Sequence, residues 1–295
     1  MSKSVLITGT SSGFDLLTAK TLAEAGYEVY ATMRGTDGKN KDAATALRTW
    51  AGEGDRSLEV VELDVTDDAS VAAAAKIVQE KSGGIDVLVN NAGIVSMGIN
   101  EAFNVEDYKR IFDVNVYGPL RVTNAFLPKM REKGHGLIIT ISSIMGRIII
   151  PFAGPYTASK WALEGLFETW RYELAPLGID NVIIEPGAFP TEIGAKMNPP
   201  SNASVTGQYG PTQDAFNEWM SGFEQLFAGD TVPNPQDVAD AVRKSIETPR
   251  GEREFRVIVD SLMADAPTAI NTQYVGAQRQ LLNALGMGGL EKIQK

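Results

Sequence analysis

Short apolar runs alternate along this chain of 295 residues with longer segments of helical character, and this alternation limits its possible folds more than any other feature. The runs are rich in β-branched residues, which is typical of strands buried on both faces of a parallel sheet. Parallel strands need long crossover connections, usually helices, so helices cover both faces. We therefore predict an α/β fold with a doubly wound, Rossmann-type parallel sheet. The predicted strands are Val5–Thr8, Glu28–Thr32, Leu58–Leu63, Val87–Asn90, Leu137–Ser142, Val182–Glu185 and Phe255–Val259, which makes seven.

The chain contains no internal repeat and no linker between domains, so we predict a single domain over residues 1–295. Its best helical patterns are Val105–Arg131 and Pro155–Pro176. The segment of about residues 190–235 is predicted to form an insertion, because the centre of this segment is loop-like and rich in Pro, Ser, Asn and Gly. Residues of about 260–295 form a C-terminal extension.

A glycine-rich turn joins the first predicted strand to a helical pattern. Thr8–Gly13 follows the strand, and the pattern then runs from Phe14 to Ala25 with Gly26 as its stop. Backbone N–H groups at a helix N-terminus attract phosphate, and glycines allow a pyrophosphate to approach closely. The turn is therefore either a phosphate-binding loop, which we favour, or a tight turn and no more.

Tyr156 and Lys160 have the spacing Y-x-x-x-K, and Ser143 lies thirteen residues before the tyrosine. In a helix, Tyr156 and Lys160 lie one turn apart on the same face. A fixed ammonium favours the ionised form of a neighbouring phenol, whose ordinary pKa is about 10, so the phenol can exchange protons near neutral pH. Ser143 ends a predicted buried strand and can hold the reacting oxygen. The alternative is a surface tyrosine with a helical lysine neighbour.

Composition excludes several classes of partner. A net charge of −10 and a pI near 4.8 argue against nucleic acid and anionic membranes. The chain has no cysteine and one histidine, which excludes disulfides and thiol catalysis and leaves too few ligands for a usual zinc site. That histidine, His135, stands between glycines and is interpreted as a solvated turn residue.

No membrane or targeting segment is apparent in the sequence. The N-terminal residues lack a basic segment followed by a long apolar stretch. The longest apolar region, Leu137 to Phe152, is interrupted by polar residues and cannot cross a bilayer. We expect no membrane partner and a cytoplasmic protein.

Further motifs follow the glycine-rich turn in order along the chain. Asp64–Val65 follows the third predicted strand, Asn90–Gly93 the fourth, and Pro186–Gly187 with Thr191 the sixth. With TGTSSGFD at Thr8–Asp15 and the Ser-Tyr-Lys group, the chain resembles the short-chain dehydrogenase/reductase family, whose glycine pattern is T-G-x-x-x-G-x-G. Its VYATMR segment and long extension are most similar to the hydroxysteroid and retinol dehydrogenase branch.

The resemblance implies hydride transfer between a nicotinamide and a carbonyl or alcohol, with Tyr156 as general acid or base. Lys160 would lower the pKa of Tyr156 and hold the nicotinamide ribose, and Ser143 would hydrogen-bond the substrate oxygen. Asn115, in FDVNVYG, would anchor a water, or is a structural amide in a kinked helix. The residues implied in cofactor binding, besides Tyr156 and Lys160, are Gly9, Ser11, Ser12, Gly13, Phe14, Arg34, Asp64, Val65, Asn91, Ala92, Gly93, Pro186, Gly187, Phe189 and Thr191.

The end of the second strand selects the cofactor. In the family, an acidic residue there accepts the ribose hydroxyls of NAD, whereas an arginine suits the 2′-phosphate of NADP. Met33 offers no acceptor at this position, and Arg34 offers a planar donor fork. We therefore favour NADP(H) over NAD(H).

An apolar substrate is expected, because apolar residues adjoin the motifs. They are Val95, Met97, Met145, Phe152 and Phe189, and with Ser143 and Tyr156 we predict Met145 and Phe189 to contact the substrate. The insertion also carries an aromatic stripe at helical spacing, which is either core packing or, by the resemblance, a substrate lid. The stripe consists of Phe216, Trp219, Met220, Phe223 and Phe227.

Asp15 departs from the family pattern, because it stands where the third glycine is expected. A carboxylate in the first turn of a helix interacts favourably with the helix dipole and stabilises the cofactor-free fold by about 0.3–1 kcal/mol, but it repels a bound pyrophosphate. We expect weakened cofactor binding, unless Asp15 turns into solvent.

Two other classes of function remain open. A regulatory protein that senses nucleotides could use the same fold, and Asp15 slightly favours it. A non-redox epimerase or dehydratase is the third reading. The intact Asn115, Ser143, Tyr156 and Lys160 favour the oxidoreductase.

A homodimer or homotetramer is expected, since the family commonly assembles through two long helices. Here these helices are Val105–Arg131 and Pro155–Pro176. Trp161, Phe167 and Trp170 are predicted to be exposed there and to need cover.

Overall fold

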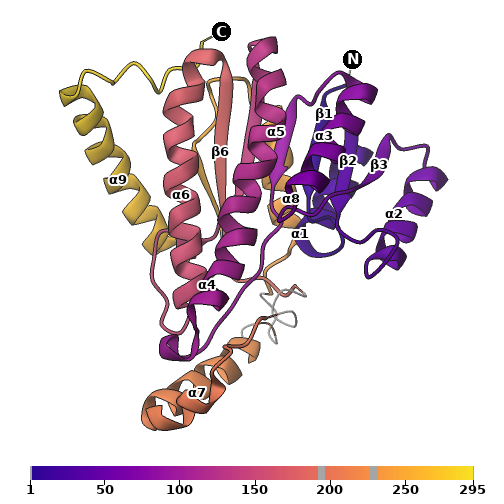
Figure 1. Ribbon diagram of the computed structural model, residues 1–295. Helices are drawn as coiled ribbons and strands as arrows, with labels where there is room; N and C mark the ends of the chain where they lie inside the picture. Colours follow the sequence, from indigo (N-terminus) through magenta and orange to yellow (C-terminus); the bar gives the residue numbers. More distant parts are fainter. Residues whose placement is uncertain (1, 192–196, 226, 228–231, 295) are drawn as a thin grey trace.

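The computed structural model describes residues 2–191, 197–225, 227 and 232–294 of the chain. At its centre lies a seven-stranded sheet with the order β3-β2-β1-β4-β5-β6-β7, in which all neighbouring strands are parallel (Figure 1). All seven predicted strands are confirmed, and their ends shift by three residues at most. The strands are β1 (Ser4–Thr8), β2 (Glu28–Met33), β3 (Leu58–Glu62), β4 (Val87–Asn90), β5 (Gly136–Ile141), β6 (Ile179–Pro186) and β7 (Arg256–Val259).

Helices cover both faces of the sheet. On β1, Val5 and Ile7 pack in one apolar core, whereas Leu6 packs in the other, because successive strand residues point to opposite faces. The first core includes residues of α1 (Gly13–Glu24), α2 (Lys41–Glu53) and α8 (Gln236–Glu247), and the second includes residues of α3 (Asp68–Ser82), α5 (Gly118–Lys133) and α6 (Gly154–Leu174). The doubly wound fold is therefore confirmed.

The long helix predicted at Val105–Arg131 is present, but a π turn interrupts its regular α-helical geometry. It consists of α4 (Val105–Phe112), a π turn η2 (Asp113–Tyr117) and α5. The π turn itself was not predicted, because it depends on tertiary contacts, described below, that hydrophobic periodicity does not report.

Two helices stand outside the two layers (Figure 1). Helix α7 (Pro211–Gln225) lies beyond the carboxyl ends of the strands, and α9 (Asp265–Ala284) lies beside α6. His135 is exposed in the turn after α5. The remaining short turns are η1 (Asn100–Ala102), η3 (Ile144–Gly146), η4 (Ala175–Leu177) and η5 (Ala203–Tyr209).

Within the part of the chain that the structure describes, no helix is both long and apolar enough to span a bilayer. Over the same residues, no three side chains of the usual metal-ligating types come together as a candidate ion site.

Candidate active site

Ser143 and Tyr156 meet at the carboxyl end of β5. Ser143 caps the short turn η3, where its Oγ accepts a hydrogen bond from the Met145 N–H at 3.2 Å. Tyr156 lies in the first turn of α6, where the preceding Pro155 suits a helix start. The Ser143 hydroxyl lies close enough to the Tyr156 phenol to affect its pKa; Ser143 is buried, and Tyr156 is partly buried. The structure thus brings together the two groups that the sequence spacing predicted.

Lys160 lies one turn further along α6 and is 5% exposed. Its Nζ donates to the Ile141 carbonyl at 2.9 Å and lies 5.6 Å from the centre of the Tyr156 ring. Burial lowers the pKa of Lys160 to about 8, although the charges of Glu164 and Asp15 act in the opposite direction. The lysine is thus held at the pair, but its own charge is disfavoured by burial.

In this structure the pKa of Tyr156 shifts opposite to the direction expected from Lys160, and the role of Tyr156 as general acid or base stays a prediction. Burial raises the pKa of Tyr156 to about 12, and the Ser143 hydrogen bond opposes this only in part. The phenol therefore keeps its proton at neutral pH. This is the form that a general acid needs in order to protonate a carbonyl oxygen during reduction.

Asn115 lies in the π turn and uses its whole side-chain amide. Its Oδ1 accepts from the Ile94 N–H at 2.9 Å, and its Nδ2 donates to the Ile94 carbonyl at 2.9 Å and to Ser159 Oγ at 3.0 Å. The side chain therefore ties η2 to the loop after β4 and to α6. The structural interpretation is supported by these contacts, and the water-anchoring role stays a prediction.

The glycine-rich loop lies between the ends of β1 and β4. Thr8 Oγ1 accepts from the backbone N–H groups of Asn91 and Ala92 at 3.0 and 3.1 Å, which joins this loop to the Asn90–Gly93 motif. Gly9 has φ of +89° and Gly13 has φ of +67°, and no atom lies within 4 Å of the place where a Gly13 Cβ would stand. The N-terminus of α1 is thus left open in the way that an approaching phosphate requires.

Most other predicted cofactor residues also lie at strand ends. Pro186 ends β6, and the Gly187 N–H donates to the Val259 carbonyl at 2.9 Å. Val65 is buried. Phe189 is buried in the core with residues of α1 and packs edge-on against Phe14 at 5.3 Å, and its role as a substrate contact stays a prediction. The Thr191 N–H donates to the Phe189 carbonyl at 2.9 Å and so holds that segment.

Arg34 lies at the end of β2 with 48% of its side chain exposed. It forms a long ion pair of 3.7 Å with Asp64. Lys39, which the sequence analysis missed, packs against Gly35, with its Cγ 3.2 Å from where a Cβ of Gly35 would stand. Burial, and next the charge of Arg34, lower the pKa of Lys39, and the charge of Asp64 opposes this. Arg34 and Lys39 are joined by a glycine-rich turn, which the sequence shows as RGTDGK. In this turn Gly35 has φ of +66°. Two cationic groups thus flank the end of β2.

Asp15 does not turn into solvent, so that alternative is wrong. It is 6% exposed, and its Oδ2 packs against Gly9, 3.0 Å from where a Cβ of Gly9 would stand. Burial raises the pKa of the Asp15 carboxyl well above its usual range, while the Asn91 amide and the Lys160 charge oppose this. A carboxyl that holds a proton repels a pyrophosphate less than a carboxylate does. Weakened cofactor binding stays a prediction.

A separate apolar cluster surrounds Tyr156. Its buried members are Val95, Met97, Met145 and Ala153, and Tyr156 itself packs against them. Helix α7 contributes to the same cluster, so its stripe does not belong to the main core. Its contributing residues are Phe216, Trp219 and Met220. The side chain of Phe223 and residues 192–196, 226 and 228–231, all in the predicted lid, lie outside the described part.

The fold and this site define a class of protein. An open glycine loop at a helix N-terminus and a cationic strand end fit a nicotinamide dinucleotide. A Ser-Tyr-Lys group next to an apolar cluster fits proton transfer to a substrate oxygen. The class is a dinucleotide-dependent oxidoreductase of the Rossmann type.

The chain belongs to the short-chain dehydrogenase family, whose sequence model ("short chain dehydrogenase") matches residues 3–202. It is 38% identical to human (Homo sapiens) 17-beta-hydroxysteroid dehydrogenase type 1 over 253 residues, which cover 83% of this chain and 74% of the relative. It is 37% identical to human retinol dehydrogenase 8 over 254 residues, which cover 84% of this chain and 79% of the relative. Both relatives lie in the hydroxysteroid and retinol dehydrogenase branch that the motifs indicated.

A solved short-chain dehydrogenase from Streptomyces avermitilis has a similar fold. It superposes with a TM-score of 0.75 and 31% identity, and the match covers 98% of each chain. These relatives are named dehydrogenases, so the protein is an enzyme acting on CH–OH and C=O groups. Nothing in the comparisons supports the regulatory alternative.

Proposed function

We propose that the protein interconverts an apolar ketone or aldehyde and its alcohol with NADP(H), with Tyr156 as the group that exchanges the proton. The observation that carries this proposal is the meeting of the buried Ser143 with the partly buried Tyr156, which packs against an apolar cluster. The nicotinamide supplies or accepts the hydride when bound. The protein supplies a phenol that is protonated at neutral pH and a serine hydroxyl that can hold the substrate oxygen.

The residues around Tyr156 favour an apolar substrate. A polar substrate would leave its own groups without partners among Val95, Met97 and Met145, and burying an unpaired polar group costs about 1–3 kcal/mol. Lys160 is proposed to hold the nicotinamide ribose, since its Nζ, bound to the Ile141 carbonyl at 2.9 Å, still has two further donors.

A substrate panel tests this function. Estrone, retinaldehyde and acetophenone would each be offered with NADPH and with NADH, and oxidation of the nicotinamide would be followed by absorbance. We expect turnover of at least one of these carbonyl compounds with NADPH. Reduction of polar sugars or hydroxy acids alone would contradict the proposal.

Arg34 is proposed to select NADPH. Its exposed guanidinium can bind a 2′-phosphate in bidentate fashion, with Lys39 as a second cation. Arg34→Ala should weaken NADPH binding by about 1.5–3 kcal/mol and NADH binding little. Calorimetric titration with both cofactors measures these changes. Arg48→Ala, at an exposed arginine on α2, is the control. If Arg34→Ala weakened the binding of NADPH and NADH equally, Arg34 would not select NADPH.

The outer side of α4, η2 and α6 is proposed as the surface of a homodimer or homotetramer. Val105, Tyr117 and Trp161 are 68%, 47% and 46% exposed there. Phe167 is fully buried and not exposed as predicted, whereas Trp170 is partly buried and packs edge-on against it at 5.0 Å. Light scattering at micromolar concentration should give at least twice the chain mass of 31.8 kDa. A monomer would contradict this proposal.

A further inference from the structure

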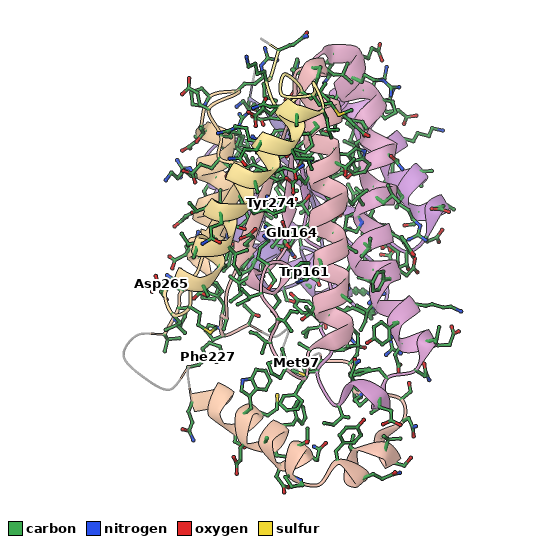
Figure 2. All side chains as sticks on the ribbon, turned by 90° about the vertical axis from the view of Figure 1, so that its left-hand side faces the viewer. Met97, Trp161, Glu164, Phe227, Asp265 and Tyr274 are labelled. Carbon is green, nitrogen blue, oxygen red and sulfur yellow. The ribbon has the colours of Figure 1, made fainter. Side chains whose placement is uncertain are left out.

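Asn271 on the C-terminal helix α9 is buried and uses both ends of its side-chain amide. Its Oδ1 accepts a hydrogen bond from Arg147 Nε at 2.7 Å, and its Nδ2 donates to Glu185 Oε2 at 2.7 Å. The residue is 9% exposed. Figure 2 shows how α9 runs along the catalytic helix α6, with Tyr274 and Glu164 labelled between them.

The two partners of Asn271 belong to the two segments that hold Ser143. Arg147 ends the turn that Ser143 begins, in which the Gly146 N–H donates to the Ser143 carbonyl at 2.8 Å. Glu185 directly precedes Pro186, whose carbonyl oxygen lies 3.5 Å from Ser143 Oγ. One amide of α9 therefore closes a ring of contacts around Ser143, although it lies 128 positions away in the chain.

The side chains in this ring have little freedom to rearrange. Arg147 is 8% exposed and its guanidinium lies 4.4 Å from the centre of the Tyr274 ring, also on α9. Glu185 is fully buried. Removing one partner from buried charged groups is costly, because the remaining partner is left without compensation. If the Asn271 amide is lost, we expect Arg147 and the turn attached to it to shift.

The same network reaches the helix that carries Tyr156 and Lys160. Arg256 on β7 lies 3.3 Å from Glu185 Oε1 and 2.9 Å from Glu164 Oε2. Glu164 lies one helical turn beyond Lys160 in α6, and its charge is the main one that supports the Lys160 ammonium. Helix α9 therefore connects with both segments of the site.

We propose that Asn271 is a positioning residue for the reduction, which holds the Ser143 hydroxyl where the substrate oxygen gains negative charge. This proposal rests on the role proposed above for Ser143. A hydrogen-bond donor of this kind acts through its position, and small displacements reduce the rate strongly. The C-terminal extension then contributes to catalysis by positioning Ser143.

A double-mutant cycle tests the proposal. The probe is whichever of estrone, retinaldehyde and acetophenone the wild-type enzyme reduces fastest with NADPH. Asn271→Ala should lower kcat on the order of tenfold, while the dissociation constant for NADPH, measured by calorimetry, stays within about twofold. In a Ser143→Ala background, measured by single turnover at high enzyme concentration, the same change should have almost no further effect.

Gln273→Ala, on the exposed side of α9, is the matched control and should leave kcat unchanged. Asn271→Ser replaces the alanine variant if that one does not fold, because its hydroxyl keeps a polar group but cannot reach both partners. An equal loss of kcat in both backgrounds would overturn the proposal, as would a loss explained by NADPH affinity. If Ser143→Ala itself had no effect, the proposal would fail through Ser143 and the proposed function would fail with it.

Discussion

Tyr156→Phe should lower kcat/KM for carbonyl reduction at least a hundredfold while the fold and NADPH binding remain. Ring packing in the apolar cluster is retained, and only the hydroxyl beside Ser143 is lost. A positioned general acid contributes typically about 10²–10⁴-fold, or about 2.7–5.5 kcal/mol of transition-state stabilisation. Steady-state kinetics with NADPH, together with circular dichroism and calorimetry, would measure the three quantities.

Tyr172→Phe provides the control on the same helix. Its hydroxyl donates to Glu168 Oε1 at 2.8 Å, so the variant also loses a half-buried phenol, but one that is remote from Ser143. We expect kcat/KM to stay within about threefold of wild type. If Tyr156→Phe kept more than about a tenth of the activity, a loss below about 1.4 kcal/mol, Tyr156 would not be the proton donor.

The free energy of unfolding should fall as the pH rises from about 5 to about 8, and Glu185→Gln should remove much of this slope. Burial, and next the charge of Glu164, raise the pKa of Glu185 to about 8. The folded protein therefore holds this proton more tightly than the unfolded chain, whose glutamates have a pKa of about 4.3. The stabilisation is complete below that pKa and is lost as the pH approaches 8. One proton gives a slope of at most about 1.4 kcal/mol per pH unit.

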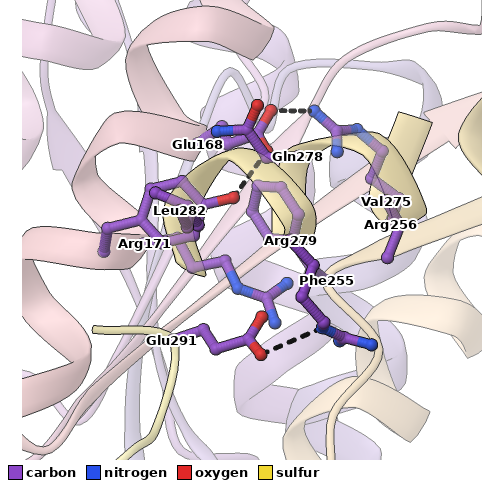
Figure 3. A pocket seen from close by; sticks show the side chains of 10 residues that line it. Glu168, Arg171, Phe255, Arg256, Val275, Gln278, Arg279, Leu282 and Glu291 are labelled. Atoms are coloured by element: carbon purple, nitrogen blue, oxygen red, sulfur yellow. Dashed lines mark hydrogen bonds and ion pairs between the residues drawn. The ribbon is translucent and has the colours of Figure 1, made fainter. Parts of the chain in front are cut away.

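The groups that face Glu185 explain why it keeps a proton. Three carboxyl groups, those of Glu164, Glu168 and Glu185, share the network with the guanidinium groups of Arg147 and Arg256. Figure 3 shows the outer end of this network, where Arg256 Nη2 contacts Glu168 Oε2 at 2.8 Å. With one carboxyl group in excess and little water, protonation costs less than a third buried charge.

Chemical denaturation at several pH values would measure this effect. At pH 5 the Glu185→Gln variant should resemble wild type, and at pH 8 it should be the more stable protein. Glu106→Gln is the control, because that side chain is 75% exposed and pairs with Lys109 on the surface. Its expected effect is within about 0.5 kcal/mol at every pH. Parallel curves for wild type and Glu185→Gln would contradict the assignment of the proton to this network.

The sheet could be predicted from the sequence because its strands are apolar on both faces. The start of β6 was missed for a physical reason: Asp180 and Asn181 are polar but buried. Asp180 pairs with Arg253 at 2.8 Å, and the Asn181 amide donates to the Phe167 carbonyl at 2.8 Å. Hydropathy reports the cost of burying such residues, but not the partners that compensate for it.

The sequence predicted those residues of the candidate site that lie close together in one motif. It did not predict the residues that meet there from distant segments of the chain. The spacing of Ser143 and Tyr156 is local enough to indicate their meeting. The positions of Asp15 against Gly9, of Lys39 beside Arg34 and of Asn271 behind Ser143 depend on tertiary packing, and no spacing in the sequence specifies them.

The π turn at Asp113–Tyr117 sets the rotational phase of everything that follows it in the helix. The buried positions Asp107, Ile111, Asn115, Pro119 and Thr123 recur at every fourth residue, a spacing that drifts by about 40° per step in a regular α-helix. The π turn contains one additional residue, which corresponds to about 100° of rotation and compensates for most of the accumulated drift. Deleting a single residue there would therefore rotate α5 about its axis and turn its apolar stripe away from the sheet. Insertions and deletions should be tolerated far less in this segment than in the exposed turn at Gly134 and His135, where the same helix ends.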